Sequence, residues 1–430
     1  MKILLIGSGG REHALAWQLT KNPSVQLISA PGNPALAALG EAVPIPAGNL
    51  GALASLARKV QPDLTIIGPE TPLVMGLADL LRQDGLAVFG PSGRAAQIEG
   101  SKVFAKDFMI RHNLPTASYA VFYDKEEAQQ YLEAASYPLV LKADGLAQGK
   151  GVIICGTYQS ALKALGTLAA LEAGKRILVE EYLAGEEISY FVFTDGQTIV
   201  SLPSAQDHKT IFDSNCGPNT GGMGAYCPAP LVSDYLDRLI RRTIIEPAVA
   251  GLSTEGTPFS GLLYAGLMIT LSGPKLLEFN ARFGDPETQA LMPLLKSDLA
   301  EICLATAQGR LQEAEAVWDD KSSVNIVMSA EGYPGPYRRG DLITGLEDAR
   351  SLPEVQVFEA GVERRLEDGR ITSYTNGGRV LSVTALGSNL EEAIRRAYEA
   401  VNLIKWNGAH FRRDIGSKGL NRSILYESEE

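Results

Sequence analysis

The stretch Leu276-Leu-Glu278-Phe-Asn280-Ala-Arg282-Phe-Gly-Asp285-Pro-Glu287 begins as an apolar strand and ends in polar residues. Alternate side chains of a strand point to the same face, so the oxygens of Glu278 and Asn280 lie side by side. A carboxylate beside an amide carbonyl suits Mg²⁺, which usually keeps its other positions for water and phosphate. Arg282 follows on that face and offers a planar fork to a carboxylate or phosphate. The stretch predicts a site for a metal, a nucleotide and an anionic substrate, although an ordinary surface strand end has the same composition.

A glycine-rich hairpin forms a second candidate for phosphate binding. Tyr137–Lys142 reads as a buried strand, Ala143–Gly151 as a glycine-rich turn and Val152–Cys155 as the next strand. A Walker A loop is excluded because Lys150 is followed by glycine and a strand rather than by Ser or Thr and a helix. Glycines let backbone N–H groups close over phosphates, and Lys142 can hold one as a point charge. The alternative is a mobile hairpin tip with solvated lysines.

The third candidate is an acidic hinge after another apolar strand. Ile177-Leu-Val-Glu180-Glu181-Tyr182-Leu183 leads through a short turn to Glu187. Backbone groups of such a hinge can pair with the edge of an adenine, and a carboxylate can accept ribose hydroxyls, as in other nucleotide sites. We expect Glu187 to take the ribose, with a solvated acidic edge as the alternative.

The first hundred residues alternate short strands and helices. Strands are expected at 2–6, 25–30, 64–68 and 87–89, which favours a parallel sheet with helices on both faces. The turn Gly7-Ser-Gly9-Gly10-Arg11-Glu12 is only a partial dinucleotide fingerprint, and no acidic residue ends the second strand, so NAD is rejected. A glycine turn at a helix N-terminus still favours a single phosphate, which Arg11 would reinforce.

Composition narrows the class of protein. The chain has 430 residues, a formal charge of −11 and 45% apolar residues, enough for several cores. An acidic chain is a poor partner for nucleic acid, and no stretch reaches the ~20 apolar residues of a membrane span. The four cysteines contain no Cys-x-x-Cys pair, and we expect reduced thiols in a cytoplasmic protein.

These three segments together resemble the ATP-grasp fold, and further motifs narrow the resemblance. The N-terminal glycine turn, Gly68-Pro69-Glu70, Gln206-Asp-His-Lys209, Gly217-Pro-Asn219-Thr-Gly-Gly-Met-Gly224 and Phe411-Arg-Arg-Asp414 occur in this order. In that order they resemble the phosphoribosylamine–glycine ligase (glycinamide ribonucleotide synthetase) family over essentially the whole chain. The resemblance implies an α/β ATP-grasp architecture. Its parts would be an N-terminal doubly wound parallel-sheet domain, a small mobile ATP lid lobe, a central ATP-grasp lobe and a C-terminal α/β domain.

The expected domains follow from this architecture and the pattern of strands and helices. They are an N-terminal domain at 1–100, a linking helix at 101–116, a lid lobe at 117–190, a central lobe at 191–318 and a C-terminal domain at 319–430. Within the central lobe, residues 203–230 read as a long, packed, glycine-rich loop, and loops of this length are usually functional or disordered.

The resemblance also implies a reaction and its site residues. Glycine and 5-phospho-D-ribosylamine would be joined at the expense of ATP, with Mg²⁺ or Mn²⁺ at Glu278 and Asn280. Phosphoribosylamine would lie near Gly9, Gly10, Arg11, Glu12, Pro69 and Glu70. Arg282, Lys142 and Asp213 would act on the reacting groups, with Asp213 near glycine's ammonium, although it could merely cap a loop. ATP contacts would come from Lys102, Lys142, Lys150, Glu180, Glu181, Tyr182, Leu183, Glu187, Lys209 and Asn219.

One segment departs from the family's usual pattern, and two other functions stay open. The family commonly has arginine where this chain has Thr210, and Gly-Asp where it has Ser214-Asn215, so an arginine contact to ATP is absent or comes from elsewhere. Another ATP-grasp carboxylate–amine ligase and a nucleotide-binding regulator are the alternatives. The expected partners are small molecules, with transient contact to a neighbouring enzyme of purine synthesis.

Overall fold

The computed structural model describes residues 1–146 and 151–420. Its N-terminal domain is a five-stranded parallel sheet in the order β3-β2-β1-β4-β5, as expected from the alternating pattern. Between β4 and β5 the chain forms two helices rather than one, because Gly76 adopts a left-handed backbone with φ of +86° between them. The strands are β1 (Lys2–Gly7), β2 (Gln26–Pro31), β3 (Glu41–Ala42), β4 (Leu64–Ile67) and β5 (Val88–Phe89), and the helices are α1 (Gly10–Leu19), α2 (Pro34–Leu39), α3 (Leu50–Val60), α4 (Glu70–Val74) and α5 (Leu77–Gln83).

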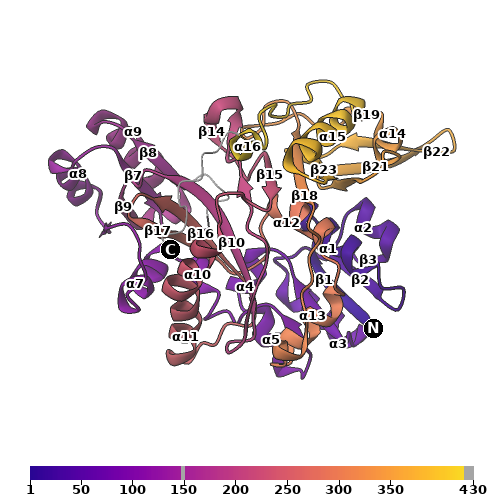
Figure 1. Cartoon of the computed structure of the whole chain (residues 1–430), viewed down its shortest axis with the longest axis horizontal. Helices are drawn as coiled ribbons and strands as arrows, with labels where there is room; N and C mark the ends of the chain where they lie inside the picture. Colours follow the sequence, from indigo (N-terminus) through magenta and orange to yellow (C-terminus); the bar gives the residue numbers. More distant parts are fainter. Residues whose placement is uncertain (147–150, 421–430) are drawn as a thin grey trace.

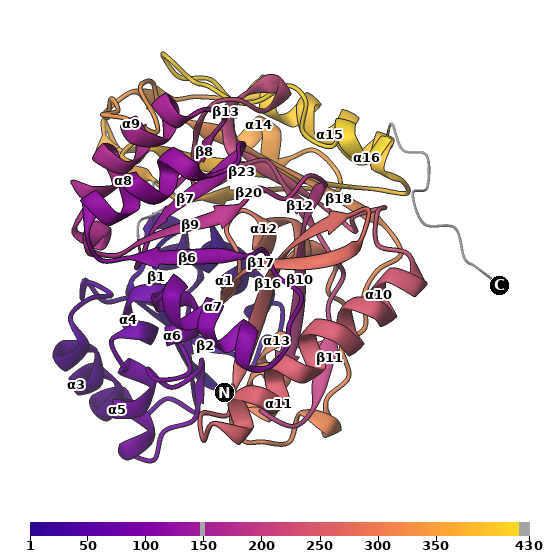
Figure 2. The same cartoon turned by 90° about the vertical axis from the view of Figure 1, so that its left-hand side faces the viewer.

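Two short helices lead into a separate small lobe. The Ser101 hydroxyl caps the second helix by accepting the N–H of Phe104. The lobe is an antiparallel sheet in the order β6-β9-β7-β8 with two helices and its own apolar core (Figures 1 and 2). Its elements are α6 (Gln97–Gly100), α7 (Lys102–Arg111), β6 (Tyr119–Phe122), α8 (Lys125–Ala134), β7 (Leu139–Ala143), β8 (Val152–Cys155), α9 (Tyr158–Ala169), the 3₁₀ turn at Glu172–Lys175 and β9 (Ile177–Glu181).

A second antiparallel sheet forms the central lobe, in the order β11-β10-β16-β17. Strand β10 begins at Glu186, so this sheet already includes residues that the sequence assigns to the lid lobe, and the change between sheets falls at 182–185 rather than at 190. The elements are β10 (Glu186–Thr194), β11 (Ile199–Ser201), α10 (Asp234–Ile240), a π-turn (Arg241–Ile245), α11 (Glu246–Thr254), β16 (Gly261–Thr270), β17 (Gly273–Asn280), α12 (Glu287–Leu291), a 3₁₀ turn (Met292–Leu294), α13 (Leu299–Ala307) and a 3₁₀ turn (Leu311–Glu313).

The prediction of an irregular loop at 203–230 is wrong, because the segment contains four short strands. Two of them extend the C-terminal sheet, which runs in the order β12-β15-β18-β23-β20, and the other two form a hairpin. Hydrogen bonds to neighbouring segments, not apolar periodicity, make these residues extended. They are β12 (Gln206–Asp207), β13 (Thr210–Phe212), a 3₁₀ turn (Asp213–Asn215), β14 (Cys216–Asn219) and β15 (Gly224–Cys227).

The C-terminal domain packs helix α15 on this antiparallel sheet and adds a small sheet in the order β19-β22-β21. Figure 1 shows this domain and the small lobe as the two upper corners of the molecule, above the N-terminal and central parts. Among the described residues, no helix is long and apolar enough to cross a membrane. The elements are β18 (Ser322–Ser329), β19 (Leu342–Ile343), α14 (Leu346–Arg350), β20 (Val355–Glu359), β21 (Val362–Glu367), β22 (Arg370–Thr375), β23 (Arg379–Gly387), α15 (Leu390–Leu403) and α16 (Ser417–Leu420).

Candidate active site

The Glu278–Asn280 pair lies at the end of β17, with the two-residue spacing that puts both side chains on one face. Glu278 pairs with Gly266 of β16, where even a Cβ atom would come within 3.3 Å of the Glu278 side chain. Burial would raise the pKa of Glu278, but the surrounding cations lower it below its usual value. Those cations are Lys209, Lys142, Lys102 and Arg282. An ionised carboxylate and an amide oxygen among four cations fit a hard divalent ion that also binds a nucleotide.

Two buried lysines share one carboxylate above this pair. Glu180 Oε2 lies 2.9 Å from Lys142 Nζ and 3.1 Å from Lys106 Nζ, and each of the three side chains is less than a tenth exposed. Lys106 also donates to Thr116 Oγ1 at 2.8 Å. The sequence analysis did not identify Lys106, because its position in an amphipathic helix gives no sign that the packing of the lobe buries it. Two ammonium groups against one carboxylate leave a positive charge, which suits a phosphate.

Lys102 and the start of the glycine hairpin are in direct contact. Lys102 Nζ donates to the carbonyl of Gly145 at 2.8 Å, and burial lowers the pKa of Lys102. Asp144 accepts the N–H of Val103 at 3.1 Å, which ties the first turn of α7 to strand β7. Lys150, the other lysine expected here, lies outside the described residues.

The expected nucleotide hinge connects β9 to β10. Glu181 and Tyr182 are exposed there, and Leu183 is buried. Beyond the hinge, Glu187 forms an ion pair with Lys209. Burial opposes the charge on this lysine, but Glu187 and other carboxylates raise its pKa above the usual value. Two residues assigned to the nucleotide from separate motifs are thus brought together.

Arg282 is held by two glutamates of the N-terminal domain. Its Nη2 lies 2.9 Å from Glu99 Oε1 and its Nε 3.5 Å from Glu70 Oε2. Glu99 Oε2 also accepts the N–H of Ala281 at 2.6 Å. Glu70 was expected near the substrate, whereas Glu99 carries no motif and was missed. Burial raises the pKa of Glu99, although Arg282 opposes this shift.

The glycine turn before α1 differs from the expected open phosphate site. Glu12 folds back so that its Oε2 accepts the N–H of Gly9 at 2.6 Å, and its Oε1 pairs with Arg11 Nε at 2.6 Å. Arg11 is buried and also donates to the carbonyl of Phe283 at 3.1 Å. The carboxylate of Glu12 therefore occupies the anion position at this turn. A Cβ atom on Gly68, beside Pro69, would lie only 2.2 Å from Glu12, so the glycines make room for that carboxylate.

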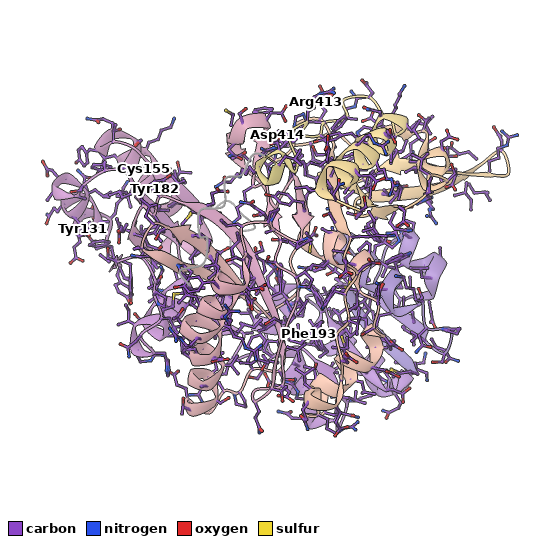
Figure 3. The ribbon with its side chains drawn as sticks, in the orientation of Figure 1. Tyr131, Cys155, Tyr182, Phe193, Arg413 and Asp414 are labelled. Carbon is purple, nitrogen blue, oxygen red and sulfur yellow. The ribbon has the colours of Figure 1, made fainter. Side chains whose placement is uncertain are left out.

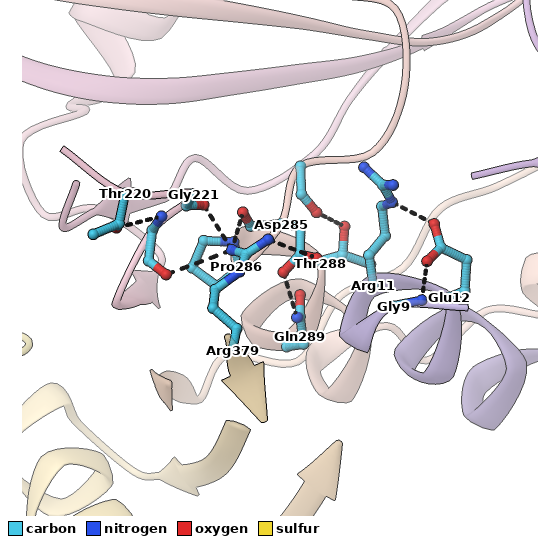
Figure 4. Close-up of polar contacts among 12 residues, drawn as sticks. Gly9, Arg11, Glu12, Thr220, Gly221, Asp285, Pro286, Thr288, Gln289 and Arg379 are labelled. Atoms are coloured by element: carbon cyan, nitrogen blue, oxygen red, sulfur yellow. Dashed lines mark hydrogen bonds and ion pairs between the residues drawn. The ribbon is translucent and has the colours of Figure 1, made fainter. Parts of the chain in front are cut away.

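A cavity of about 290 Å³ lies between this turn and the C-terminal sheet, lined in part by Gly9 and Gly10. Ser382 Oγ and Gln289 Oε1 belong to lining residues, are buried and have no hydrogen-bond partner among the described residues. Arg379 forms one wall, where its Nη1 donates to the carbonyls of Gly221 at 2.6 Å and Asp285 at 3.0 Å (Figure 4). The sequence analysis missed Arg379 because it stands alone at the start of a distant strand.

Two further acidic residues take different positions. Asp213, expected near glycine, is exposed on the hairpin, where its Oδ1 accepts the N–H of Arg413 at 2.7 Å. This contact corresponds to the loop-capping alternative and argues against a role at the reacting groups. Glu287 is buried, and its Oε1 accepts the hydroxyls of Tyr264 at 2.8 Å and Ser189 at 3.3 Å. Asn219, at the other end of the hairpin, is exposed.

Comparison with known families covers nearly the whole chain. Residues 1–99, 100–288 and 323–418 match the models of the N domain, the ATP-grasp (A) domain and the C domain of phosphoribosylglycinamide synthetase. The phosphoribosylamine–glycine ligase of Allochromatium vinosum is 51% identical over 98% of this chain and 99% of its own length. That of Vibrio cholerae is 48% identical with the same coverage.

Solved structures agree with the fold. The phosphoribosylamine–glycine ligase of Thermotoga maritima is similar with a TM-score of 0.82 and 32% identity, over 96% of this chain and 100% of that one. A biotin carboxylase of Campylobacter jejuni, with a TM-score of 0.69 and 15% identity over 99% and 96% of the two chains, shares the fold alone. The chain therefore belongs to the phosphoribosylamine–glycine ligase family of ATP-dependent ligases and has the ATP-grasp fold.

Proposed function

We propose that the chain joins glycine to 5-phospho-D-ribosylamine through a glycyl phosphate, giving glycinamide ribonucleotide, ADP and phosphate in purine synthesis. The observation that carries the proposal is that Lys142, from the glycine hairpin, lies close to Glu278, Asn280 and Arg282, which belong to one stretch at and just beyond the end of β17. Identity of about half with ligases of this name over the full length supports it. The four cysteines are free thiols, in keeping with a cytoplasmic enzyme.

ATP binds between the small lobe and the central sheet in this proposal. Lys102 and Lys142 hold its phosphates, joined by Lys150 of the glycine hairpin. The hinge from Glu180 and Glu181 through Tyr182 and Leu183 takes the adenine, and Glu187 takes the ribose. Lys209, which directly precedes the 210–219 hairpin, and Asn219, at the end of the hairpin, complete the contacts to ATP.

Glu278 and Asn280 would hold Mg²⁺ or Mn²⁺, since both ligands offer hard oxygens and the carboxylate is ionised. When bound, the ion supplies charge neutralisation at the transferring phosphoryl group. Among the described residues, no group of three or more His, Cys, Asp or Glu side chains could enclose a metal. This donor set suits an ion that takes its remaining ligands from nucleotide phosphates and water.

The two reacting substrates meet near Arg282. A carboxylate is a poor electrophile for an amine, so glycine must first be activated as an acyl phosphate. Arg282 steadies glycine's carboxylate, and Glu70 and Glu99 fix the orientation of the guanidinium. We place phosphoribosylamine in the cavity beside Gly9 and Gly10, where unpartnered polar atoms face a sugar phosphate. Arg11, Glu12 and Pro69 do not line this cavity, but Glu12 fixes the turn at Gly9 by accepting its N–H; Asp213 is left out of the proposal.

The test is release of ADP with glycine present, with and without freshly generated phosphoribosylamine. We expect release only with both substrates, and a product that carries both glycine and the ribose phosphate. Bicarbonate or D-alanine in place of glycine distinguishes other ATP-grasp ligases. Binding of ATP with no turnover on any of these substrates would favour the regulator and contradict the proposal.

A further inference from the structure

The hairpin β13–β14 extends away from its own lobe. Residues 212–219 are all exposed, yet the hairpin is anchored to the segment 410–414 at the C-terminal end of the fold. His410 Nε2 lies 2.8 Å from the carbonyl oxygen of Ile211, and the Phe212 ring packs edge-on against His410 at 5.6 Å between centroids. Figure 3 shows Arg413 and Asp414 at the top of the molecule, where this segment lies.

Arg412 is the centre of that anchor, and its side chain has no exposed surface. Its Nη1 donates to Thr210 Oγ1 at 2.9 Å and to the Thr210 carbonyl at 3.2 Å. Its Nη2 donates to Asn215 Oδ1 at 3.3 Å and to Asp414 Oδ2 at 2.7 Å, while its Nε donates to Asp414 Oδ1 at 2.7 Å. One planar fork thus contacts the base of the hairpin, its tip and a carboxylate at the same time.

Asp414 completes the anchor at the tip of the hairpin. Its Oδ2 accepts the N–H of Ser214 at 2.9 Å. Ser214 and Asn215 have φ of 58° and 55°, left-handed conformations that cost side-chain-bearing residues roughly 1–2 kcal/mol each. Burial would raise the pKa of Asp414, but the bonds from Arg412 and Ser214 lower it to about 2. The unfavourable turn is therefore held by an ionised carboxylate from another domain.

The base of this hairpin carries the two residues assigned to the nucleotide. Lys209 directly precedes β13, and Asn219 is the strand partner of Thr210. The carbonyl of Lys209 also accepts the N–H of Thr220 at 2.7 Å and its hydroxyl at 2.8 Å. Any shift of Thr210 relative to the C-terminal segment moves both nucleotide-facing residues, because the hairpin hydrogen bonds couple them.

We propose that Arg412 is a positioning residue for the nucleotide, which fixes Lys209 and Asn219 by docking their hairpin on the C-terminal segment. This inference rests on the proposed function, because it assigns those two residues to ATP. Arg412 reaches the nucleotide only through Thr210 and the hairpin, so it is not a catalytic residue. A purely structural arginine would hold the C-terminal end of the chain with no selective effect on any substrate.

The test compares Arg412→Met with Arg413→Met, the neighbouring arginine. Arg413 is exposed, and only its backbone N–H contributes to the anchor. Binding of a non-hydrolysable ATP analogue with Mg²⁺ is measured by calorimetry on the full chain without other substrates. We expect Arg412→Met to raise the dissociation constant on the order of tenfold or more, the loss of one charge-assisted contact, and Arg413→Met to leave it unchanged. In both variants the KM for glycine should equal that of the parent protein.

Two milder variants cover the case in which Arg412→Met does not fold. Thr210→Val removes one acceptor at constant shape, and Asp414→Asn removes the charge at the tip. Both should weaken analogue binding severalfold. Unchanged binding in every folded member of this series would overturn the inference, as would equal losses for the ATP analogue and glycine. If the parent protein binds the analogue but makes no product, the proposed function is contradicted instead. Failure of the proposed function can therefore be distinguished from failure of the inference about Arg412.

Discussion

Three of the cations that we assign to the candidate site have a carboxylate partner. Lys142 pairs with Glu180, Lys209 with Glu187 and Arg282 with Glu99. Such buried pairs contribute little net stability, because desolvation of both ions offsets their attraction. Their value lies in geometry, since a cation held by a fixed carboxylate needs less reorganisation when an anionic substrate arrives.

In the proposed function the carboxylate of Glu278 binds the metal ion rather than holding a cation of the protein in place. We predict that Glu278→Gln lowers turnover at limiting Mg²⁺ by at least about tenfold, or roughly 1.4 kcal/mol of barrier, while the fold persists. Steady-state rates across a Mg²⁺ titration measure the effect. Glu301→Gln, an exposed change on α13, is the control. Equal rates for Glu278→Gln and the parent at every Mg²⁺ concentration would remove Glu278 from the metal site.

Arg11 leads to a different kind of prediction, because its guanidinium is paired inside the protein. Arg11→Ala leaves Glu12 buried without its cation, a change that costs about 3–5 kcal/mol in other buried pairs. We expect a lower thermal unfolding temperature, and the KM values for ATP, glycine and phosphoribosylamine should change together. Adding Glu12→Gln should recover part of the loss, because the unpaired charge is gone. A KM increase confined to phosphoribosylamine at unchanged stability would restore Arg11 as a phosphate ligand.

At this scale the sequence predicted residue types better than their partners. The sequence alone predicted that Glu278 and Asn280 share a face, because strand geometry fixes which side chains point the same way. It did not predict that Glu99 and Lys106 are their neighbours in the site, since the burial of both arises from packing between elements far apart in the chain. The fold-back of Glu12 was missed for another reason: the same glycine turn can bind an external anion or a carboxylate of its own helix.

At the scale of elements, β7, β8, β9 and β17 lie where the apolar runs at 137–142, at 152–155, at 177–183 and from Leu276 predict strands. The strands β12 and β15 do not carry such runs. They are short: β12 pairs with β15, and β15 in turn pairs with β18, a partner about a hundred residues away. Local patterns cannot show such pairing, which is why the segment reads as a loop.

The small lobe has its own core, and we expect it to move when ATP binds. Amide exchange of β7 and β8 should slow on addition of a non-hydrolysable ATP analogue, because Lys142 on β7 and the neighbouring backbone would then be covered. Exchange within β1, in the N-terminal sheet, serves as the internal control. Identical exchange of β7 and β8 with and without the analogue would contradict both the movement and the nucleotide position.

At the scale of the whole molecule, the domains are joined by more than their linkers. The segment 206–227 leaves the central lobe and supplies two strands to the C-terminal sheet, and Arg379 of that sheet holds Gly221 in return (Figure 4). The order of the domains was predictable from the sequence, because alternating strands and helices and the family motifs follow one another along the chain. Their interlocking was not, because it depends on hydrogen bonds between residues more than a hundred positions apart.

His13 in α1 and His208 after β12 are buried, and their neutral form in the folded protein makes stability depend on pH. His13 Nδ1 accepts the N–H of Glu359, from the C-terminal domain, at 2.8 Å. Burial lowers the pKa of His13 to about 4 and that of His208 to about 3; Glu359 partly opposes the shift at His13, while the cations Arg412 and Lys418 add to it at His208. An unfolded histidine titrates near its usual value of about 6.5, so the unfolded chain binds more protons below that pH. The stability that these residues contribute is therefore complete above pH of about 6.5 and is lost as the pH falls towards 4, by up to about 1.4 kcal/mol per pH unit for each histidine.

The prediction is a difference between variants, because Asp207 acts with the opposite sign in the same range. Its pKa is raised to about 7, mainly by burial, so its contribution to stability grows as the pH falls. We expect the unfolding temperature of His208→Gln to fall less than that of the parent between pH 6.5 and pH of about 4.5, and His13→Gln to behave alike. Most carboxylates with lowered pKa values, such as Asp414 at about 2, titrate below this window and should not contribute. Parallel curves for parent and variants would mean that both histidines titrate in the folded protein as they do in the unfolded chain, and the buried, neutral rings would then have to be placed in contact with water.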